Sequence, residues 1–482
     1  MCGILISKTN DPSVINSIIH RGIEAKTLET REGYFLTHHR LPIQTQDGDE
    51  WSQPYEISKG VYLLFNGEIF NYPTDRFSSD TEYLIDFFKQ YSTYESLLIA
   101  GVNHIQGWDG FWSIVIYNEN TRDIITFTDP LGKKQLYINT GGEVCSEIKG
   151  LVNDESEIDE AFMGAIHKWG YNHDDRTPFK DIKRLLPNNI YRWKIGSHQI
   201  KETYSQYFDF YALPKIPLEY PTESTEEHIR NIMWKSVESR LISKNYPISV
   251  LLSGGLDSAI IGSILVAMGA KVNWYTIENG EDEYVKDCEE MWGINVTRLK
   301  YDMNLDDENV IEDLKEIYCK WNETPIDLGS VVPQFNLFKA VKEKSGNRIV
   351  ISGDGADELF GGYRRINKYD SQGSDTLHEL TYYHLPRLDR MSMAHTIELR
   401  NPFLCHELIR FAMTIPLEDR TNKKILKDAF RGLVPNSVID RSKAPLKNDH
   451  IKKDPETYRE FIIQLYQDYW KEYLQTKKEL IK

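Results

Sequence analysis

The chain has 482 residues, more than one hydrophobic core normally holds, so two domains are expected. Its 40% hydrophobic and 12% aromatic content is typical of globular proteins and excludes disordered and fibrous classes. The net charge of −16 argues against a nucleic-acid partner, because phosphate backbones bind basic surfaces, but it does not exclude a local anion pocket.

Cysteine usage and hydropathy indicate the compartment. The five cysteines are odd in number and lack metal-ligand spacing, which argues against a disulfide framework or a zinc site and fits a reducing cytoplasm. No apolar run approaches the roughly 18 residues of a membrane span, and the N-terminus lacks the basic-then-apolar order of a secretory signal. We therefore expect a soluble, cytoplasmic protein with no membrane partner.

A cysteine stands directly after the initiator, in Met1-Cys2-Gly3. If Met1 is removed, the α-amine of Cys2 becomes free to act as a base for its own thiol, which makes Cys2 a candidate nucleophile. The alternative is a small buried hydrophobic residue, the usual role of an isolated cysteine.

Short strands are predicted up to about residue 210, at 33–37, 61–65, 112–117 and 123–127, and the last two are expected to form a hairpin. The run at 61–65 is apolar throughout, which predicts a strand covered on both faces. Sheets sandwiched between helices would produce this pattern.

A proline-rich stretch at 212–225 predicts a linker, because Pro214, Pro217 and Pro221 fit neither a helix nor the interior of a sheet. We therefore divide the chain into domains at 1–211 and 226–482. Ser224 followed by Glu227 resembles a capping box, so a helix is expected to open the second domain.

Strands and helices alternate in the second domain. Strands are predicted at 248–252, 272–277 and 348–351, and a helix is predicted from Asp257 to near Gly269. This alternation predicts a parallel α/β sheet, and the Lys-rich tail after Lys471 reads as a solvated helical end.

A glycine loop lies between the first of these strands and the helix, and its backbone N–H groups and the helix N-terminus favour a phosphate ligand. It lacks the Lys-[Ser/Thr] ending of a Walker loop and resembles the loops of ATP pyrophosphatases. An aspartate beside phosphates implies Mg²⁺. The alternative is an ordinary glycine turn. The predicted ATP-binding residues here are Ser253, Gly254, Gly255, Leu256, Asp257 and Ser258.

A second loop, at 352–363, also follows a strand and should face the same ligand crevice, because the carboxyl ends of parallel strands meet at one edge of a sheet. Asp257 and Asp357 are predicted to share Mg²⁺, and Asp354 is predicted to influence adenylation. The alternative is a solvated acidic turn.

These motifs together resemble the glutamine-dependent asparagine synthetases over most of the chain. Cys2-Gly3-Ile4, His20-Arg21-Gly22, His39-Arg40-Leu41, Asn66-Gly67-Glu68-Ile69-Phe70-Asn71 and Ser79-Asp80-Thr81-Glu82 match the class II glutamine amidotransferase half in order. The resemblance implies a four-layer α/β/β/α domain of the Ntn-hydrolase type, followed by a parallel-sheet α/β adenylating domain with a helical tail.

The resemblance also implies roles for residues of the first half. Arg40 and Asp80 would hold the α-carboxylate and α-amine of glutamine by charge-assisted hydrogen bonds. The Asn66 amide and the Gly67 N–H would form the oxyanion hole for the intermediate on Cys2. The remaining glutamine-binding positions implied are Leu41, Ile43 and Glu68.

In the second half the resemblance implies that AMP is bound at Leu251, Ile277, Ser352 and Gly353. Arg387-Leu388-Asp389-Arg390, Glu398-Leu399-Arg400, Pro402-Phe403-Leu404 and Arg441-Ser442-Lys443 continue the match. Lys443 would stabilise charge that develops as the bond between the α and β phosphates breaks, whereas the alternative is a surface lysine.

The chain departs from the family pattern at several positions. Ile23-Glu24 stands in place of Pro-Asp, Gln135 replaces a proline, and Cys405 stands where an aspartate normally follows Pro-Phe-Leu. The segment 324–333, expected near the acceptor carboxylate, matches less well, as does the sequence after Lys443.

The resemblance implies a relay in which Cys2 forms a glutamyl thioester, ammonia crosses a sheltered channel, and MgATP activates aspartate as an acyl-adenylate. AMP, pyrophosphate, glutamate and asparagine would be the products. The alternatives are the same chemistry on another carboxylate, whether small molecule, peptide or sugar, and a non-catalytic glutamine or nucleotide sensor. Because dimers are common in the family, a homodimer is a possible assembly.

Overall fold

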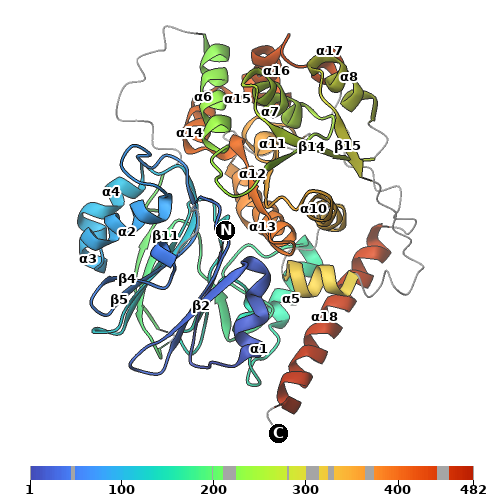
Figure 1. Cartoon of the computed structure of the whole chain (residues 1–482). Helices are drawn as coiled ribbons and strands as arrows, with labels where there is room; N and C mark the ends of the chain where they lie inside the picture. Colours follow the sequence, from blue (N-terminus) through green and yellow to red (C-terminus); the bar gives the residue numbers. More distant parts are fainter. Residues whose placement is uncertain are drawn as a thin grey trace.

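The structure is a computed structural model, and it describes residues 2–44, 49–197, 199–209, 224–278, 282–299, 314–323, 330–363, 374–441 and 455–480. Figure 1 shows a β-rich N-terminal part in blue and teal beside a second part, in green, orange and red, that is built on a parallel sheet. Most of the predicted linker, residues 210–223, lies outside the described ranges.

Within the described residues, the N-terminal part contains two six-stranded antiparallel sheets. The first sheet has the order β10 (Ile182–Arg184), β8 (Tyr137–Asn139), β9 (Val144–Cys145), β1 (Gly3–Ser7), β3 (Phe35–Arg40), β2 (Glu24–Glu29). The second has the order β12 (Ile200–Ser205), β11 (Asn189–Lys194), β7 (Asp123–Thr128), β6 (Gly110–Asn118), β5 (Val61–Ile69), β4 (Tyr55–Ser58).

The two sheets pack face to face and carry helices on their outer faces, which confirms the predicted four-layer arrangement. Ile4 and Leu36 of the first sheet share one apolar cluster with Leu64 and Val115 of the second. The outer face of the second sheet is covered by α2 (Asp80–Gln90), α3 (Tyr94–Ser96) and α4 (Val102–Ile105). The outer face of the first carries α1 (Pro12–Ile15), η1 (Asn16–Arg21) and α5 (Glu160–Trp169).

The strand predictions for this part are mostly confirmed. β5 is buried on both faces, and β6 and β7 form the predicted hairpin. The strand predicted at 33–37 begins later, at Phe35, because Gly33 adopts φ 73° in the turn that joins β2 to β3.

The second part contains, among the residues described, a five-stranded parallel sheet. Its order is β15 (Val296–Leu299), β14 (Val272–Ile277), β13 (Ile248–Leu251), β16 (Ile349–Ile351), β17 (Glu398–Arg400). β13 and β16 are neighbours, so the loops that follow them emerge side by side at one edge of the sheet.

Helices surround the parallel sheet, as its apolar strands require. The helix predicted after the linker is α6 (Thr225–Ser239), and the Ser224 side chain caps it by accepting from the Glu227 N–H at 3.2 Å. The other helices of this part are α7 (Leu256–Ala267), α8 (Asp282–Trp292), α10 (Val331–Ser345), α11 (Ala356–Leu359), α12 (Ser374–Glu379), α13 (Leu385–Met393), α14 (His406–Thr414), α15 (Leu417–Arg420), α16 (Lys424–Phe430) and α17 (Asn436–Asp440).

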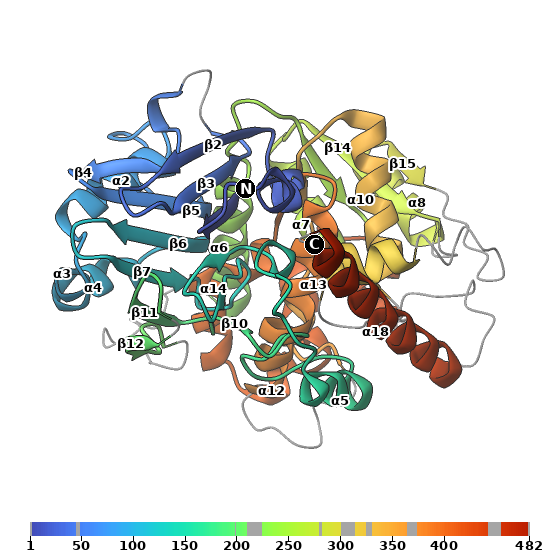
Figure 2. The same cartoon turned by 90° about the horizontal axis from the view of Figure 1, so that it is seen from below.

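The C-terminal helix α18 (Pro455–Leu480) packs against both parts. It contacts α5 of the N-terminal part and the π-helix η5 (Glu316–Asn322) of the second. Figure 1 shows α18 in red next to α5, and Figure 2 shows the same helix from below. Trp470 is fully buried and packs edge to face on Phe179. The predicted solvated helical end is therefore the end of a helix that bridges the two parts. In the portion of the chain that the structure describes, no helix is long and apolar enough to cross a membrane.

Candidate active sites

Cys2 precedes β1 and lies where the two N-terminal sheets face each other. Its backbone nitrogen donates to Asn66 Oδ1 at 2.9 Å. Burial raises the pKa of the Cys2 thiol, but other interactions, of which the one with His38 is the largest, outweigh burial and lower this pKa to about 6. The thiol is therefore mostly ionised at neutral pH, as a nucleophile requires.

His38 is a functional residue that the sequence prediction missed. Its Nε2 donates to the Phe65 carbonyl at 2.9 Å, and the interaction of His38 with the Cys2 thiol is the largest of those that lower the thiol pKa. In the pairing of β1 with β3, Ile4 is opposite His38, so alternation places Cys2, His38 and Arg40 on one face and His39 on the other. That alternation, read from Arg40, is the sequence signal that identifies His38.

The two predicted oxyanion-hole residues, Asn66 and Gly67, lie on β5. The Asn66 Nδ2 has only a long hydrogen bond, 3.4 Å, to Ser113 Oγ, so this amide can donate to a developing oxyanion. A Cβ at Gly67 would lie 2.1 Å from the Phe111 carbonyl oxygen, so only glycine fits. The structure thus places Asn66 in contact with Cys2, and Gly67 follows Asn66 in the same strand.

Two buried carboxylates, Glu68 and Asp80, lie near the same site. Asp80 accepts from the Ile69 N–H at 3.1 Å, and burial raises its pKa to about 7. Burial also raises the pKa of Glu68, helped by Glu398 of β17, and Gln44 donates to this carboxylate. Uncompensated buried carboxylates favour a cationic ligand such as an α-ammonium group, and Glu398 shows that the second part approaches the glutamine site.

The other predicted glutamine-binding positions follow β3. Arg40 is mostly buried and forms a 3.3 Å ion pair with Glu24. Leu41 and Ile43 are buried, with their side chains in one apolar cluster. The Ile43 carbonyl accepts from the Lys244 N–H at 3.0 Å, which ties this segment to the second part.

The first candidate phosphate loop follows β13, and hydrogen bonds of serine side chains fix its conformation. The Ser253 N–H donates to Ser258 Oγ at 3.1 Å, and that hydroxyl donates to the Gly255 carbonyl at 3.0 Å. Gly254 adopts φ 74°, a conformation that favours glycine. Leu256 and Asp257 begin α7, so the loop presents a helix N-terminus to its ligand. Leu251 ends β13 and Ile277 ends the neighbouring β14.

The second loop follows β16 and touches the first. A Cβ at Gly353 would lie 2.8 Å from the Asp257 Cβ, so the two loops are in direct contact. Ser352 Oγ donates to Asp354 Oδ2 at 2.6 Å and accepts from Asn401 Nδ2 at 2.9 Å. The structure therefore brings the predicted AMP-binding and phosphate-binding residues together at one edge of the sheet.

The predicted metal-binding carboxylates converge on a lysine that the sequence prediction missed. Lys423 Nζ lies 2.6 Å from both Asp257 Oδ2 and Asp357 Oδ1. Burial lowers the pKa of Lys423, yet the two carboxylates raise it above its usual value. A Cβ at Gly362 would lie 1.8 Å from Asp357 Oδ1, so a glycine there gives this carboxylate room. No motif around Lys423 pointed to this contact.

Two carboxylates aimed at one point fit Mg²⁺, which binds proteins through one or two carboxylates together with phosphate oxygens. Among the described residues, no group of three or more His, Cys, Asp or Glu side chains could hold a metal by itself. Asp257 and Asp357 therefore suit a metal that arrives with a phosphate ligand.

The predicted cation Lys443 lies outside the described residues. Its motif begins at Arg441, which is described, and Arg441 NH1 donates to the Gly254 carbonyl at 2.9 Å. The motif therefore starts at the first phosphate loop.

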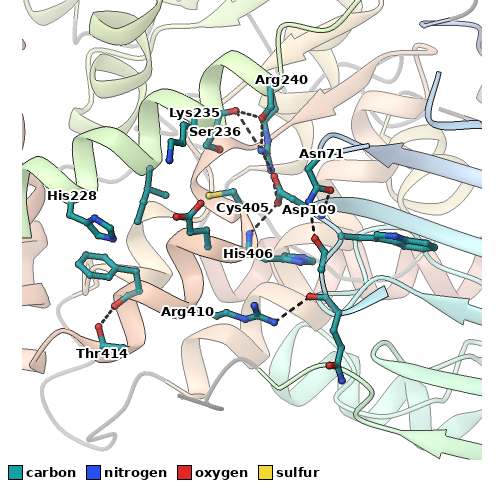
Figure 3. Close-up of a pocket in the computed structure, with 17 residues that line it drawn as sticks. Asn71, Asp109, His228, Lys235, Ser236, Arg240, Cys405, His406, Arg410 and Thr414 are labelled. Atoms are coloured by element: carbon teal, nitrogen blue, oxygen red, sulfur yellow. Dashed lines mark hydrogen bonds and ion pairs between the residues drawn. The ribbon is translucent and has the colours of Figure 1, made fainter. Parts of the chain in front are cut away.

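A cavity of about 520 Å³ lies between the two parts of the chain (Figure 3). Asp109, which precedes β6, forms hydrogen bonds to Arg240 of the second part at 2.5 and 3.0 Å, and it also accepts from the His406 N–H at 3.1 Å. None of the predicted site residues lines this cavity. The residues that line it are Asn71, Gln106, Gly107, Trp108, Asp109, His228, Ile232, Lys235, Ser236, Ser239, Arg240, Cys405, His406, Glu407, Arg410, Phe411 and Thr414.

Family models match both parts of the chain. A glutamine amidotransferase domain model matches residues 1–207, and an asparagine synthase model matches 228–381 and 374–480, more than half of the chain.

Similar proteins extend over most of the chain. A glutamine-hydrolysing asparagine synthetase of Arabidopsis thaliana is 27% identical over 92% of this chain and 77% of its own length. A probable asparagine synthetase of Acanthamoeba polyphaga mimivirus is 24% identical over 95% of this chain and 87% of its own length. The asparagine synthetase of Gallus gallus is 23% identical over 88% of this chain and 79% of its own length. Among solved structures, an NMN synthetase from Francisella tularensis covers 53% of this chain and 94% of its own at a TM-score of 0.27 and 14% identity, too low a likeness to support a statement on fold.

Proposed function

Because this chain belongs to the asparagine synthase family and carries a glutamine amidotransferase domain at its N-terminal end, we propose that it converts aspartate to asparagine with glutamine as the amide donor and ATP as the activating substrate. The observation that carries the proposal is the presence of two candidate centres in one chain. Cys2, whose thiol pKa is lowered to about 6, contacts Asn66, and two glycine loops follow the neighbouring strands β13 and β16. The names of the relatives support the choice of aspartate as acceptor.

In the first half-reaction, the Cys2 thiolate attacks the amide carbon of glutamine. Asn66 Nδ2 and the Gly67 N–H stabilise the oxyanion. The carbon–nitrogen bond then breaks as the leaving nitrogen takes the proton that the thiol gave to the α-amine of Cys2, which is free once Met1 is removed, and ammonia departs. Water then hydrolyses the thioester to glutamate and restores the thiol. Arg40 and Asp80 hold the α-carboxylate and α-ammonium groups, so that only an unblocked amino acid is positioned for attack.

In the second half-reaction, the side-chain carboxylate of aspartate attacks the α-phosphorus of ATP and pyrophosphate leaves. The backbone at Leu251, Ile277 and 352–353 holds the AMP portion, and the loop at 253–258 holds the departing phosphates. Asp257 and Asp357 would hold Mg²⁺, which neutralises phosphate charge. Lys423, already between these carboxylates, supplies a further positive charge at the same point.

Ammonia then attacks the β-aspartyl adenylate, which gives asparagine and AMP. Free ammonia is protonated in water and loses its nucleophilicity, so the two centres need a route between them that excludes solvent. Buried contacts across the junction of the two parts support such a route. Lys133 Nζ, in the N-terminal part, donates to the Leu399 carbonyl and to Asn401 Oδ1, each at 2.6 Å.

All five cysteines are free thiols. This supports a reducing compartment, and we place the enzyme in the cytoplasm.

Pyrophosphate release in the presence of ATP, Mg²⁺ and ammonium, measured with a series of carboxylates, tests the acceptor. Aspartate should give the highest kcat/KM, and asparagine should appear in equal amount with pyrophosphate. A higher value for another carboxylate would assign the same chemistry to a different acceptor. If no carboxylate in the series supports pyrophosphate release, the result would favour a sensor that binds ligands without turnover.

A further inference from the structure

A series of buried ion pairs crosses the junction between the two parts and begins at the nucleophile. Arg21 donates through Nε to the Cys2 carbonyl at 3.0 Å and through NH1 to Glu147 Oε1 at 2.7 Å. Its NH2 donates to Asp389 Oδ2, in α13 of the second part, at 3.0 Å. One side chain therefore touches both the backbone of the nucleophile and the second part.

The series continues through Arg390 to Glu323. Arg390 NH1 lies 3.0 Å from Glu147 Oε1, and Arg390 NH2 lies 3.4 Å from Glu323 Oε2. The side chains of Arg21, Glu147, Arg390 and Glu323 are each at most 1% exposed. Three charged side chains thus connect the Cys2 carbonyl to the Glu323 carboxylate without solvent exposure.

Glu323 holds the second part against the first. Its carboxylate accepts from the backbone N–H groups of Ile148 and Lys149, at 3.0 and 2.9 Å, although these residues lie in the N-terminal part. Its own carbonyl accepts from the hydroxyl of Tyr466 in α18. Glu323 adopts φ 58°, which is uncommon for a residue other than glycine and indicates that its surroundings fix its conformation.

The position of Glu323 in the chain relates it to the acceptor side of the second part. It directly precedes the segment 324–333, which is predicted to lie near the acceptor carboxylate; residues 324–329 of that segment lie outside the described residues, and α10 begins within it at Val331. A shift of residue 323 would change the charge facing Arg390, and buried charges interact strongly because little solvent screens them.

We infer that Glu323 is a positioning residue that couples occupancy of the acceptor side to the geometry of the Cys2 site. The inference rests on the proposed amidotransferase function. Buried ion pairs contribute little net stability relative to apolar packing, so stability alone explains such a series poorly. Coupling between two sites requires a physical connection whose state both sites influence, and the Arg21, Glu147 and Arg390 side chains provide one.

The test compares Glu323→Gln with Glu316→Gln. Glu316 lies in η5, pairs with Lys320 and accepts from Trp321 Nε1 in the same helix, so Glu316→Gln removes a charge from the same element without removing the anion that faces Arg390. Glutaminase rate is measured with and without saturating aspartate and ATP. In the wild type and in Glu316→Gln, these substrates should raise the rate. In Glu323→Gln the stimulation should fall by about fivefold or more, the usual scale of coupling between sites, while the unstimulated rate and ammonium-dependent synthesis stay within about twofold of wild type.

Each outcome bears on the inference in a defined way. Stimulation retained in Glu323→Gln, or absent from the wild type, overturns it. A parallel loss of all three activities assigns Glu323 a structural role and also overturns it. Failure of the proposed function is seen separately, as a wild-type enzyme that makes no asparagine from aspartate and ammonium.

If Glu323→Gln does not fold, Lys149→Met perturbs the same junction without removing an anion. Lys149 Nζ lies 2.5 Å from Glu147 Oε2 and donates to the Lys320 carbonyl at 2.8 Å. Loss of stimulation with retained ammonium-dependent synthesis supports the inference, and unchanged stimulation contradicts it.

Discussion

At the scale of single residues, the interaction of Cys2 with His38 should set the pH dependence of the proposed attack on glutamine. The thiol pKa of about 6 means that kcat at saturating glutamine should rise about tenfold per pH unit below that value and level off above it. Asp80, whose pKa is raised to about 7, also titrates in the free enzyme, so kcat reports on Cys2 more cleanly than kcat/KM does.

His38→Gln should move the inflection in kcat to higher pH, because the group that most lowers the thiol pKa is lost. His39→Gln is the matched control, since His39 points to the opposite face and contacts the Ile15 carbonyl at 2.8 Å. An inflection that stays near pH 6 in His38→Gln would show that His38 does not activate Cys2.

The Lys423 ammonium group lies between the carboxylates of Asp257 and Asp357 and pairs with both. Lys423→Met should lower the free energy of unfolding of the ligand-free protein by about 3 kcal/mol, the lower end of the cost of breaking a buried pair, since both carboxylates keep about a fifth of their exposure. Added Mg²⁺ should then raise the Tm of this variant more than that of the wild type, because a cation replaces the lost ammonium.

Differential scanning fluorimetry with and without Mg²⁺ makes this comparison. Lys424→Met is the control, because Lys424 pairs with Asp419 at the surface. An equal Mg²⁺ response in Lys423→Met and in the wild type would mean that Asp257 and Asp357 do not bind the metal without a phosphate ligand.

At the scale of elements, Asp109 compensates for a residue that α14 lacks. Cys405 precedes α14 and makes no side-chain cap, whereas Asp109 of the N-terminal part accepts from the His406 N–H and pairs with Arg240. Asp109→Asn should therefore destabilise the protein by about 2 kcal/mol, through the lost charge on Arg240 and a weaker cap.

The matched rescue is Cys405→Asp in the Asp109→Asn background, which returns a carboxylate to the N-terminus of α14. Urea unfolding at constant m-value measures both steps. The compensation is disproved if the double variant is no more stable than Asp109→Asn alone.

Elements with a strong local signal were predicted well from sequence. The apolar run of β5, the hairpin of β6 and β7, and the start of α6 at Ser224 each follow from residues close together in the chain. Residues that act through distant partners were not predictable in this way. Alternation from Arg40 places His38 on one face of its strand, but its contact with Cys2 depends on the register of β1 with β3. Lys423 reaches Asp257 across 166 positions, and this contact leaves no local pattern.

At the scale of the whole molecule, the two reactive centres belong to separate parts that meet across buried charges. The Arg21 side chain connects the two parts, because it donates both to the Cys2 carbonyl and to Asp389 in α13. Glu398 of β17 in turn influences Glu68 beside the glutamine site. These contacts connect the two parts as the proposed function requires, with ammonia made in one part and used in the other.

The most direct test of this account is the Cys2→Ala variant, assayed for asparagine formation with glutamine and, separately, with ammonium. Glutamine-dependent formation should be abolished, because no other described group is placed to form the thioester, while ammonium-dependent formation should stay within about twofold of wild type. Loss of both activities in a folded variant, or retention of the glutamine-dependent activity, would contradict the account.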